Sequence, residues 1–380
     1  MYSEMKIHYL DNSATTAVCE AAARKAYDMM TVCYGNPSSL HGIGIEAERE
    51  VEAARGIIAR SLSADAKNII FTSGGTEANN LALFGAADAL KRRGDRIIVS
   101  AVEHPSVRES AKRLAQLGFD VHEAPVGSDG VIIMDELTAL LNSKTILVSV
   151  MAVNNETGSV QPTELIAKAV HRLCPDALFH VDAVQAYCKT PLKPKKLSAD
   201  LMSVSAHKIH GPKGIGALYI REGARLSPLL YGGEQQHKLR PGTESSPLIA
   251  AFGAAAAEAD IPADMARVRE LESLAREGLR SIDGVQINSP DNALPCIVNF
   301  SVSGIRSEIM LHFLESRGVY VSSSSACSKG KPSYVLSAMG LPAERVDSSL
   351  RASFSRYSST EDVQALIEGV REGVRVLQKR

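Results

Sequence analysis

Short apolar runs alternate with helical patterns from Asn68 onward, and few folds accommodate this rhythm. The apolar runs are residues 69–71, 96–99, 145–150, 178–181 and 201–204, and helical patterns such as 106–117 and 162–173 separate them. Strands that alternate with helices in this way form a mainly parallel sheet with helices on both faces. We therefore predict an α/β fold, preceded by an amphipathic helix over residues 46–62.

The rhythm changes after an alanine-rich helical stretch at residues 248–259. Ile261-Pro262 breaks that pattern, and a long charged helix over 264–281 follows. Later segments predict strands at 295–300 and 319–321 and helices at 307–317 and 360–378. We expect a large domain over residues 15–258. A smaller α+β domain is expected to combine residues 1–14 with residues 259–380.

Polar residues follow most of the apolar runs directly. They are Gly74-Gly75-Thr76, Glu103-His104, Asn154-Asn155-Glu156, Asp182 and Lys208. Ligands of open α/β sheets bind at the carboxyl ends of the strands. We therefore expect these residues to meet at one edge of the sheet and to form the functional site.

Lys208 ends the segment 205–208, which reads SAHK and follows a buried apolar run. Burial disfavours a charged ammonium and lowers its pKa from a reference of about 10.4, so a neutral amine becomes available to condense with an aldehyde. A lysine that leaves its strand into solvent is the alternative, because the pair His-Lys is common.

Two upstream segments favour the first interpretation. Asp182 ends an apolar run, where its carboxylate can hold the proton of a pyridinium nitrogen and so make a pyridoxal ring an electron sink. The turn Gly74-Gly75-Thr76 opens a helix, where backbone N–H groups bind phosphate. Lysine, acid and phosphate turn together predict a pyridoxal 5'-phosphate site.

The motifs resemble those of a known family along nearly the whole chain. Residues 9–16 read YLDNSATT, 34–41 read YGNPSSLH, 322–327 read SSSSAC, and 350–357 read LRASFSRY. In this order they are similar to the cysteine desulfurases of the NifS/IscS type, in the class V aminotransferase family of fold-type I enzymes. The resemblance implies a homodimer that converts L-cysteine to L-alanine with pyridoxal phosphate attached to Lys208.

The resemblance also implies roles for individual residues. His104 would stack on the cofactor ring and move protons, and Asn155 and Gln185 would bind near its phenolic oxygen. Phosphate ligands would be Gly75, Thr76, Ser205 and His207, with Thr243 reaching the phosphate of the neighbouring subunit. Arg351 would clamp the substrate carboxylate, together with Asn36 or Asn155. The alternatives, which are purely structural, are a capping or core role for His104, a turn for Asn36 and a salt bridge for Arg351.

Cys327 is the predicted sulfur acceptor. It lies in a polar segment with Lys329 and Lys331 nearby, which favour the thiolate. By resemblance it attacks the substrate sulfur and carries it as a persulfide to an acceptor protein. The stretch from Cys327 to Pro332 is shorter than in typical relatives, their C-terminal tail is missing, and residues 234–238 depart from their pattern. These differences make a dedicated iron–sulfur scaffold less secure as the acceptor and leave a ThiI-like tRNA thiolation protein or another sulfur carrier equally open.

Two other functions share part of this pattern. A selenocysteine lyase or an aminotransferase of the same family would use Lys208 and Asp182 without requiring Cys327. A non-catalytic adaptor could keep the fold and bind a sulfur carrier, although the presence of Lys208 argues against it. A colourless protein unchanged by borohydride would identify such an adaptor.

Composition excludes several other classes. The chain carries 42 basic and 43 acidic residues, so no excess charge indicates nucleic-acid binding. No apolar stretch is long enough for a membrane span or a signal peptide, which leads us to expect a cytoplasmic protein. The 6 cysteines show no metal-ligand spacing, so we expect free thiols and no metal.

Overall fold

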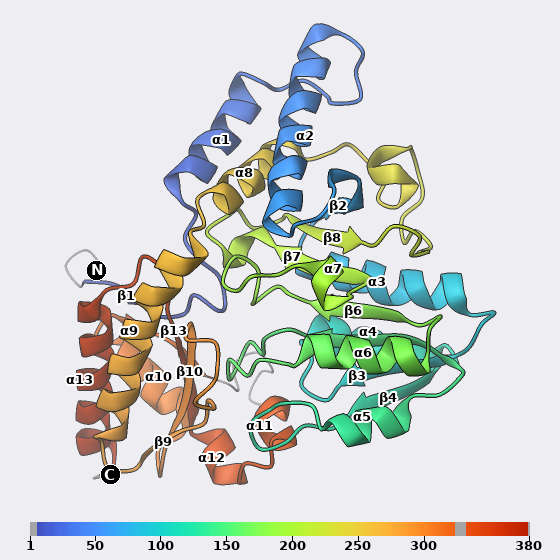
Figure 1. The fold of residues 1–380 in the computed structure, drawn as a ribbon. Coiled ribbons are helices and arrows are strands. Elements are labelled where there is room, and N and C mark those ends of the chain that lie inside the picture. Colours follow the sequence, from blue (N-terminus) through green and yellow to red (C-terminus); the bar gives the residue numbers. More distant parts are fainter. Residues whose placement is uncertain (1–5, 324–331, 379–380) are drawn as a thin grey trace.

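A mostly parallel sheet forms the centre of the computed structural model, which describes residues 6–323 and 332–378 (Figure 1). The sheet has seven strands, in the order β2 (Ile69–Thr72), β8 (Gly216–Ile220), β7 (Leu201–Ser205), β6 (Leu178–Asp182), β5 (Thr145–Met151), β3 (Arg96–Ser100) and β4 (Asp120–Ala124). The pairs from β7 to β4 are parallel, whereas β8 runs antiparallel to both of its neighbours. The predicted α/β fold is confirmed.

Helices cover both faces of this sheet because alternate strand residues point to opposite sides. Ile97 and Val99 pack in one apolar cluster with α3 (Gly75–Leu90) and α4 (Pro105–Gln116). Ile98, which lies between them, packs in another cluster that includes residues of α6 (Thr163–Leu173). A strand buried on both faces reads as a continuous apolar run, which explains the sequence pattern. Short helices α5 (Met134–Leu140) and α7 (Pro194–Leu197) complete the connections.

Three helices lie beyond the sheet toward the top of Figure 1, where α1 (Glu20–Thr31) and α2 (Gly42–Ser61) reach the tip and α8 (Ser246–Ala257) lies lower, beside them. Helix α8 packs on both others. Gly253 allows the close approach of α8 to α2, since a Cβ there would lie 2.7 Å from the Cβ of Ala54. Helix α2 begins four residues earlier than expected, where His41 caps it by accepting a hydrogen bond from the Gly44 N–H.

A second, antiparallel sheet lies in the other half of the molecule. Its four strands are ordered β12 (Ser322–Ser323), β13 (Ser349–Ser353), β10 (Ile297–Val302) and β9 (Val285–Ile287). The helices of this half are α9 (Ile261–Arg280), α10 (Ser307–Glu315), α11 (Tyr334–Ala338), α12 (Ala343–Asp347) and α13 (Thr360–Leu377). The N-terminal strand β1 (His8–Tyr9) pairs with β11 (Val319–Tyr320). We propose the domain division between α8 and α9, with the N-terminal arm on the smaller side.

Two local features differ from the sequence expectation. Strand β4 was not expected, because its residues Asp120 to Ala124 read as polar and it lies at the edge of the sheet. Pro262 lies in the first turn of helix α9, which begins at Ile261, instead of in a break before it. A proline fits the first turn of a helix, and Asp260 caps this end by accepting a hydrogen bond from the Ala263 N–H.

Candidate active site

A cavity of about 570 Å³ lies at the carboxyl ends of the central strands, where the sheet meets the second half of the molecule. Its volume lies in the range of small-molecule sites. Residues from both halves and from the N-terminal arm line it: Ser13, Ala14, Thr15, Ser73, Gly74, Gly75, Thr76, Glu77, Asn79, His104, Ser106, Met151, Val153, Asn155, Asp182, Val184, Gln185, Ser205, His207, Lys208, Lys213, Gly214, Ser322 and Arg351.

Lys208 reaches this cavity from the short 3-10 helix η2 (Ala206–Lys208), which follows β7. Its Nζ donates hydrogen bonds to the carbonyl oxygens of Ser13 and Ala14, the second at 2.8 Å. Among the described residues, no carboxylate lies within ion-pair distance of this amine. Burial, together with the charges of Arg351 and Lys189, lowers the pKa of Lys208 to about 7. A large part of the Lys208 population is therefore a neutral nucleophile near pH 7.

Asp182 lies at the end of β6 and is 4% exposed. Its Oδ2 accepts a hydrogen bond from Asn79 Nδ2 at 2.7 Å, and its Oδ1 accepts one from the Val184 N–H at 3.0 Å. Asn79 comes from α3, so strand and helix together fix the carboxylate plane. This geometry fixes a hydrogen-bond acceptor in the wall of the cavity.

His104 caps α4 and also lines the cavity. Its Nδ1 accepts the Ser106 N–H at 3.2 Å and lies 2.9 Å from Ser106 Oγ. Because Nδ1 is engaged in this cap, the exchangeable proton of the neutral ring sits on Nε2. Burial lowers the pKa of His104, the charge of Asp182 raises it, and that of Lys208 lowers it. His104 can therefore cap α4 through Nδ1 and still move protons through Nε2, so these two alternatives from the sequence do not exclude each other.

Small residues and polar groups converge where the resemblance implies a phosphate. Gly74 has a φ of +152°, and a Cβ on Gly75 would lie 2.6 Å from Val184 Cγ2, so the helix start packs closely on the segment after β6. The hydroxyl of Ser205 is buried and has no hydrogen-bond partner among the described residues. The pKa of His207 falls to about 4 through burial and the charge of Lys208.

Arg351 enters the cavity from β13 and is 5% exposed. Its guanidinium donates to the Asn155 carbonyl oxygen at 2.9 Å, to Asp11 Oδ1 at 2.8 Å and to Ser322 Oγ at 3.0 Å. Arg351 Nε and Asn155 Oδ1 are both buried without a partner among the described residues. A donor and an acceptor left over in one cavity indicate a polar ligand that satisfies them.

Three predicted site residues do not line the cavity. Asn36 is exposed, and its Oδ1 accepts the Ser38 N–H at 3.0 Å, which is the turn-forming alternative. Thr243 is exposed on the segment before α8. Cys327 lies outside the described residues. The other predicted residues, Gly75, Thr76, His104, Asn155, Asp182, Gln185, Ser205, His207, Lys208 and Arg351, share the cavity.

The sequence did not assign the residues that hold the predicted ones in place. Ser13 and Ala14 orient Lys208 through backbone carbonyls, and Asn79 orients Asp182 through its side chain. Backbone contacts leave no trace in residue type. For Asn79 the sequence did carry a signal: this amide follows the phosphate turn within the first turns of α3, and it is buried there.

These residues fit pyridoxal phosphate. Lys208 supplies an amine that is largely neutral near pH 7, Asp182 a fixed carboxylate, and the turn at Gly74-Gly75 the N-terminus of α3, where backbone N–H groups bind phosphate. The unpartnered hydroxyl of Ser205 and the unpartnered amide oxygen of Asn155 are groups that the cofactor or its substrate would satisfy.

Glu156, the chain neighbour of the cavity residue Asn155, gives a first prediction. It accepts a hydrogen bond from Ser333 Oγ at 2.5 Å, and burial raises its pKa from 4.5 to about 7. The folded state thus holds a proton that the unfolded state loses above pH 4.5, and stability falls as pH rises through this window. Relative to wild type, Glu156→Gln should gain up to about 3 kcal/mol by pH 8 and little at pH 4.

Thermal unfolding of both apoproteins across this pH range measures the difference. The exposed Glu368→Gln variant is the control and should track wild type. A difference between Glu156→Gln and wild type that stays constant with pH would contradict the assignment.

Comparison with known proteins matches this fold and site. The model of the family "Aminotransferase class-V" matches residues 8–366. The chain is 41% identical to the mitochondrial cysteine desulfurase of Candida maltosa, over 98% of this chain and 78% of that protein. It is 40% identical to cysteine desulfurase IscS of Dictyoglomus turgidum, over 95% and 92%. A solved NifS-like protein superposes with a TM-score of 0.92 at 36% identity, over 98% of this chain and all of that one.

The chain therefore belongs to the class-V aminotransferase family. Within that family it groups with the cysteine desulfurases of the NifS/IscS type, as the motifs predicted. In the part of the chain that the structure describes, no helix is both long and apolar enough to cross a membrane.

Proposed function

We propose that this chain is a pyridoxal-phosphate-dependent cysteine desulfurase that converts L-cysteine to L-alanine and leaves a persulfide on Cys327. The observation that carries the proposal is the meeting of Lys208, Asp182 and Arg351 in one cavity. Each residue supplies a group that the reaction needs: Lys208 an amine that is neutral near pH 7, Asp182 a fixed anion and Arg351 a guanidinium. The names of the relatives support the substrate and the reaction.

When bound, pyridoxal phosphate supplies an aldehyde that condenses with amines and a conjugated ring that accepts electrons from the substrate's α-carbon. Asp182 would hold the proton of the ring nitrogen, oriented by Asn79 and the Val184 N–H. Gly75, Thr76, Ser205 and His207 would hold the phosphate. Lys208 would hold the cofactor at rest and then, as a free amine, move the α-proton of the substrate. His104 is placed to exchange protons through Nε2, since its Nδ1 caps α4.

Arg351 is the proposed partner of the substrate carboxylate. Its buried Nε carries an unused N–H, and its other nitrogens are held by Asp11, Ser322 and the Asn155 carbonyl. A planar guanidinium fixed in this way recognises a carboxylate in one orientation, which lysine would not reproduce. Asn155 would contribute its unpartnered Oδ1 to an N–H or O–H of the ligand.

The sulfur step uses Cys327. Its thiolate would attack the sulfur of cysteine, so that an S–S bond forms, the C–S bond breaks, and the carbon fragment takes the electron pair and a proton to become alanine. Of the residues that flank this segment, Ser322 lines the cavity, and Ser333 donates a hydrogen bond to Glu156, the chain neighbour of the cavity residue Asn155.

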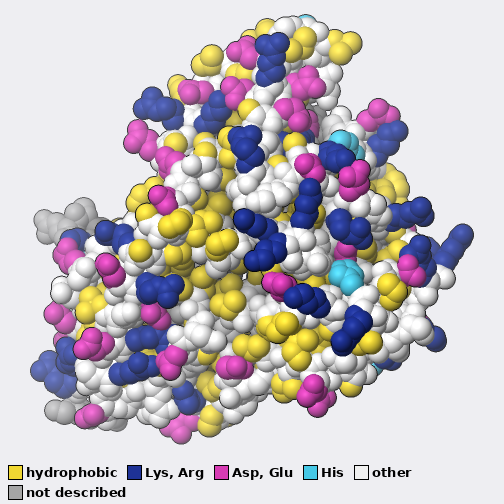
Figure 2. Space-filling model, viewed as in Figure 1, with side chains coloured by type: hydrophobic (Ala, Val, Ile, Leu, Met, Phe, Trp, Pro, Cys, Tyr) yellow, Lys and Arg dark blue, Asp and Glu magenta, His cyan; other side chains and the backbone are white. Residues whose placement is uncertain are grey.

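A homodimer is part of the proposal, with Thr243 completing the neighbouring site. Apolar side chains are exposed together on α1, α2 and the segment between them: Tyr27, Met30, Val32, Tyr34, Leu40 and Ile43, the last three 66%, 95% and 46% exposed. Hydrophobic side chains are visible at this tip in Figure 2. A patch of this kind marks an interaction site, and a second copy of the chain is the proposed occupant.

Disrupting this patch should separate the subunits. We expect wild type to sediment as a dimer and the double variant Met30→Glu, Val32→Glu to sediment as a monomer with weaker retention of the cofactor, because the Thr243 contact would be lost. Leu165→Glu introduces the same charge on α6 at a side chain that is 56% exposed and should remain dimeric. A monomeric wild-type protein in the ultracentrifuge would exclude the shared site.

The persulfide acceptor is proposed to be a protein, either a scaffold or a ThiI-like enzyme, in the cytoplasm. Acidic and basic side chains are interspersed over the face seen in Figure 2, which does not favour direct contact with nucleic acid. Pull-down of the persulfidated enzyme from its own cell extract would identify the acceptor.

Product analysis tests the proposed reaction against its rivals. The holoenzyme without reductant should form one alanine and one Cys327 persulfide from L-cysteine in a single turnover. Alanine formed equally fast from selenocysteine or cysteine sulfinate, with no need for Cys327, would instead indicate the selenocysteine lyase activity. Absence of alanine from all three substrates would reject both.

A further inference from the structure

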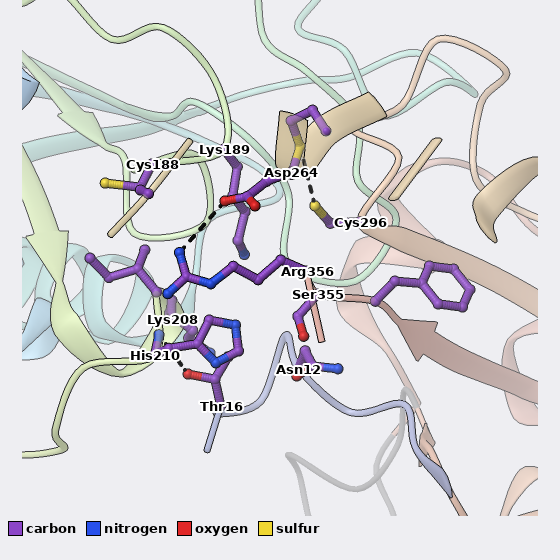
Figure 3. Close-up of a pocket in the computed structure, with 14 residues that line it drawn as sticks. Asn12, Thr16, Cys188, Lys189, Lys208, His210, Asp264, Cys296, Ser355 and Arg356 are labelled. Atoms are coloured by element: carbon purple, nitrogen blue, oxygen red, sulfur yellow. Dashed lines mark hydrogen bonds and ion pairs between the residues drawn. The ribbon is translucent and has the colours of Figure 1, made fainter. Parts of the chain in front are cut away.

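A second buried lysine lies behind Lys208. Lys189 and Lys208 both line a small cavity of about 30 Å³ between the two halves of the molecule. This cavity is distinct from the large cavity of the candidate active site, although Lys208 lines both. Figure 3 shows the side chain of Lys189 extending into this space near Arg356. The volume suffices for about one water molecule, so it is no site for a further substrate.

Lys189 has no counterion among the described residues. Its Nζ donates one long hydrogen bond, to Gln185 Oε1 at 3.4 Å. The carboxylate in the cavity belongs to Asp264, which is committed to Arg356 at 3.6 Å. The neighbouring thiols stay protonated, since burial raises the pKa of Cys188 to about 12 and also raises that of Cys296. An ammonium that is out of water without an acid partner is costly, and burial accordingly lowers the pKa of Lys189.

A chain of hydrogen bonds joins the two lysines. Gln185 accepts from Lys189 through Oε1 and donates through Nε2 to the Ser13 carbonyl oxygen at 2.9 Å. The same carbonyl oxygen accepts a hydrogen bond from Lys208 Nζ. The amide of Gln185 is thereby held in one orientation, and Ser13 is held against Lys208.

We propose that Lys189 is a positioning residue for the reaction, which keeps Lys208 in its neutral, nucleophilic form by its charge and orients it through Gln185 and Ser13. This rests on the proposed function of Lys208. Two ammonium groups in one poorly solvated region repel each other, so a proton on Lys189 disfavours a second proton on Lys208.

Other charged and titratable groups surround the pair, among them His104 and the exposed Lys213, which line the large cavity with Lys208. Arg351 acts in the same direction as Lys189 on Lys208, whereas Asp11 and Asp182 act in the opposite direction. Burial lowers the pKa of His207 and of His210 to about 4, so both imidazoles are neutral near pH 7. Among the described residues, Lys189 therefore has neither a carboxylate partner nor an assigned ligand.

The test measures the protonation midpoint of Lys208 in the apoenzyme. Trace labelling with acetic anhydride from pH 5 to 11, analysed by peptide mass spectrometry, gives this midpoint. Wild type should show a midpoint near 7. Lys189→Met should raise it by about one pH unit, which leaves roughly tenfold less neutral amine at pH 6. Lys189→Arg, which keeps the charge, should stay close to wild type.

Two further variants keep the test decisive. Lys189→Gln is a second neutral replacement if the methionine variant fails to fold, and Lys195→Met removes a lysine that is 61% exposed and should change nothing. An unchanged midpoint in the folded neutral variants would overturn the proposal. Because neither cofactor nor substrate is present, this result is readable even if the protein forms no alanine from cysteine.

Discussion

Replacing Lys208 by alanine should lower alanine formation from L-cysteine by at least about a thousandfold, because one change removes both the covalent anchor of the cofactor and the proton carrier. The variant should still fold, since Lys208 has no acid partner among the described residues and its removal leaves no buried charge unpaired. Steady-state alanine assays and the absorbance of the bound cofactor measure the two losses separately.

Lys195→Ala is the matched control, because Lys195 is exposed and pairs with Asp65 at the surface. It should retain full activity. If Lys208→Ala kept more than about a tenth of wild-type turnover, the amine would not be the catalytic group, whatever its pKa.

The second large effect is expected for Cys327→Ser. A serine hydroxyl is a far weaker nucleophile toward sulfur than a thiolate, so sulfur transfer should fall to background while cofactor binding and absorbance stay at wild-type levels. Sulfide release with dithiothreitol and mass spectrometry of the isolated enzyme measure the loss. The persulfide mass of one extra sulfur should be absent from the variant.

The other cysteines provide the control for this variant. Cys19, Cys33, Cys174, Cys188 and Cys296 are all buried and free. Cys33→Ser should therefore leave desulfuration unchanged apart from a small loss of stability. Full activity of Cys327→Ser would refute the assigned role and would move the protein toward the selenocysteine lyase alternative.

The sequence predicted the parts of this site that depend on strand ends. Asp182 and Lys208 were identifiable because each follows an apolar run, and the parallel sheet brings both runs to one edge. Strand β4 escaped prediction because an edge strand is half exposed and keeps polar residues. The same reasoning explains why fold class is easier to predict than every strand.

Contacts between distant segments could not be predicted. Arg351 is held by Asp11, 340 positions away in the sequence, and Lys208 by the carbonyls of Ser13 and Ala14. These contacts depend on the N-terminal arm lying between the two sheets, which β1 fixes by pairing with β11. No local pattern in residues 8–16 indicates that position.

Asn36 shows a second limit of prediction from sequence. Its residue type suits both a turn and a ligand, and in this subunit its side chain serves the turn. Whether a neighbouring subunit brings it to a site depends on the dimer, which the Met30→Glu, Val32→Glu variant tests.

The central claim is that Lys208 carries pyridoxal phosphate. Borohydride reduction of the holoenzyme followed by peptide mass spectrometry tests it most directly. The peptide containing Lys208 should gain the mass of a phosphopyridoxyl group at that residue, and the visible absorbance should disappear. A colourless protein, or a reduced protein with Lys208 unmodified, would contradict the account.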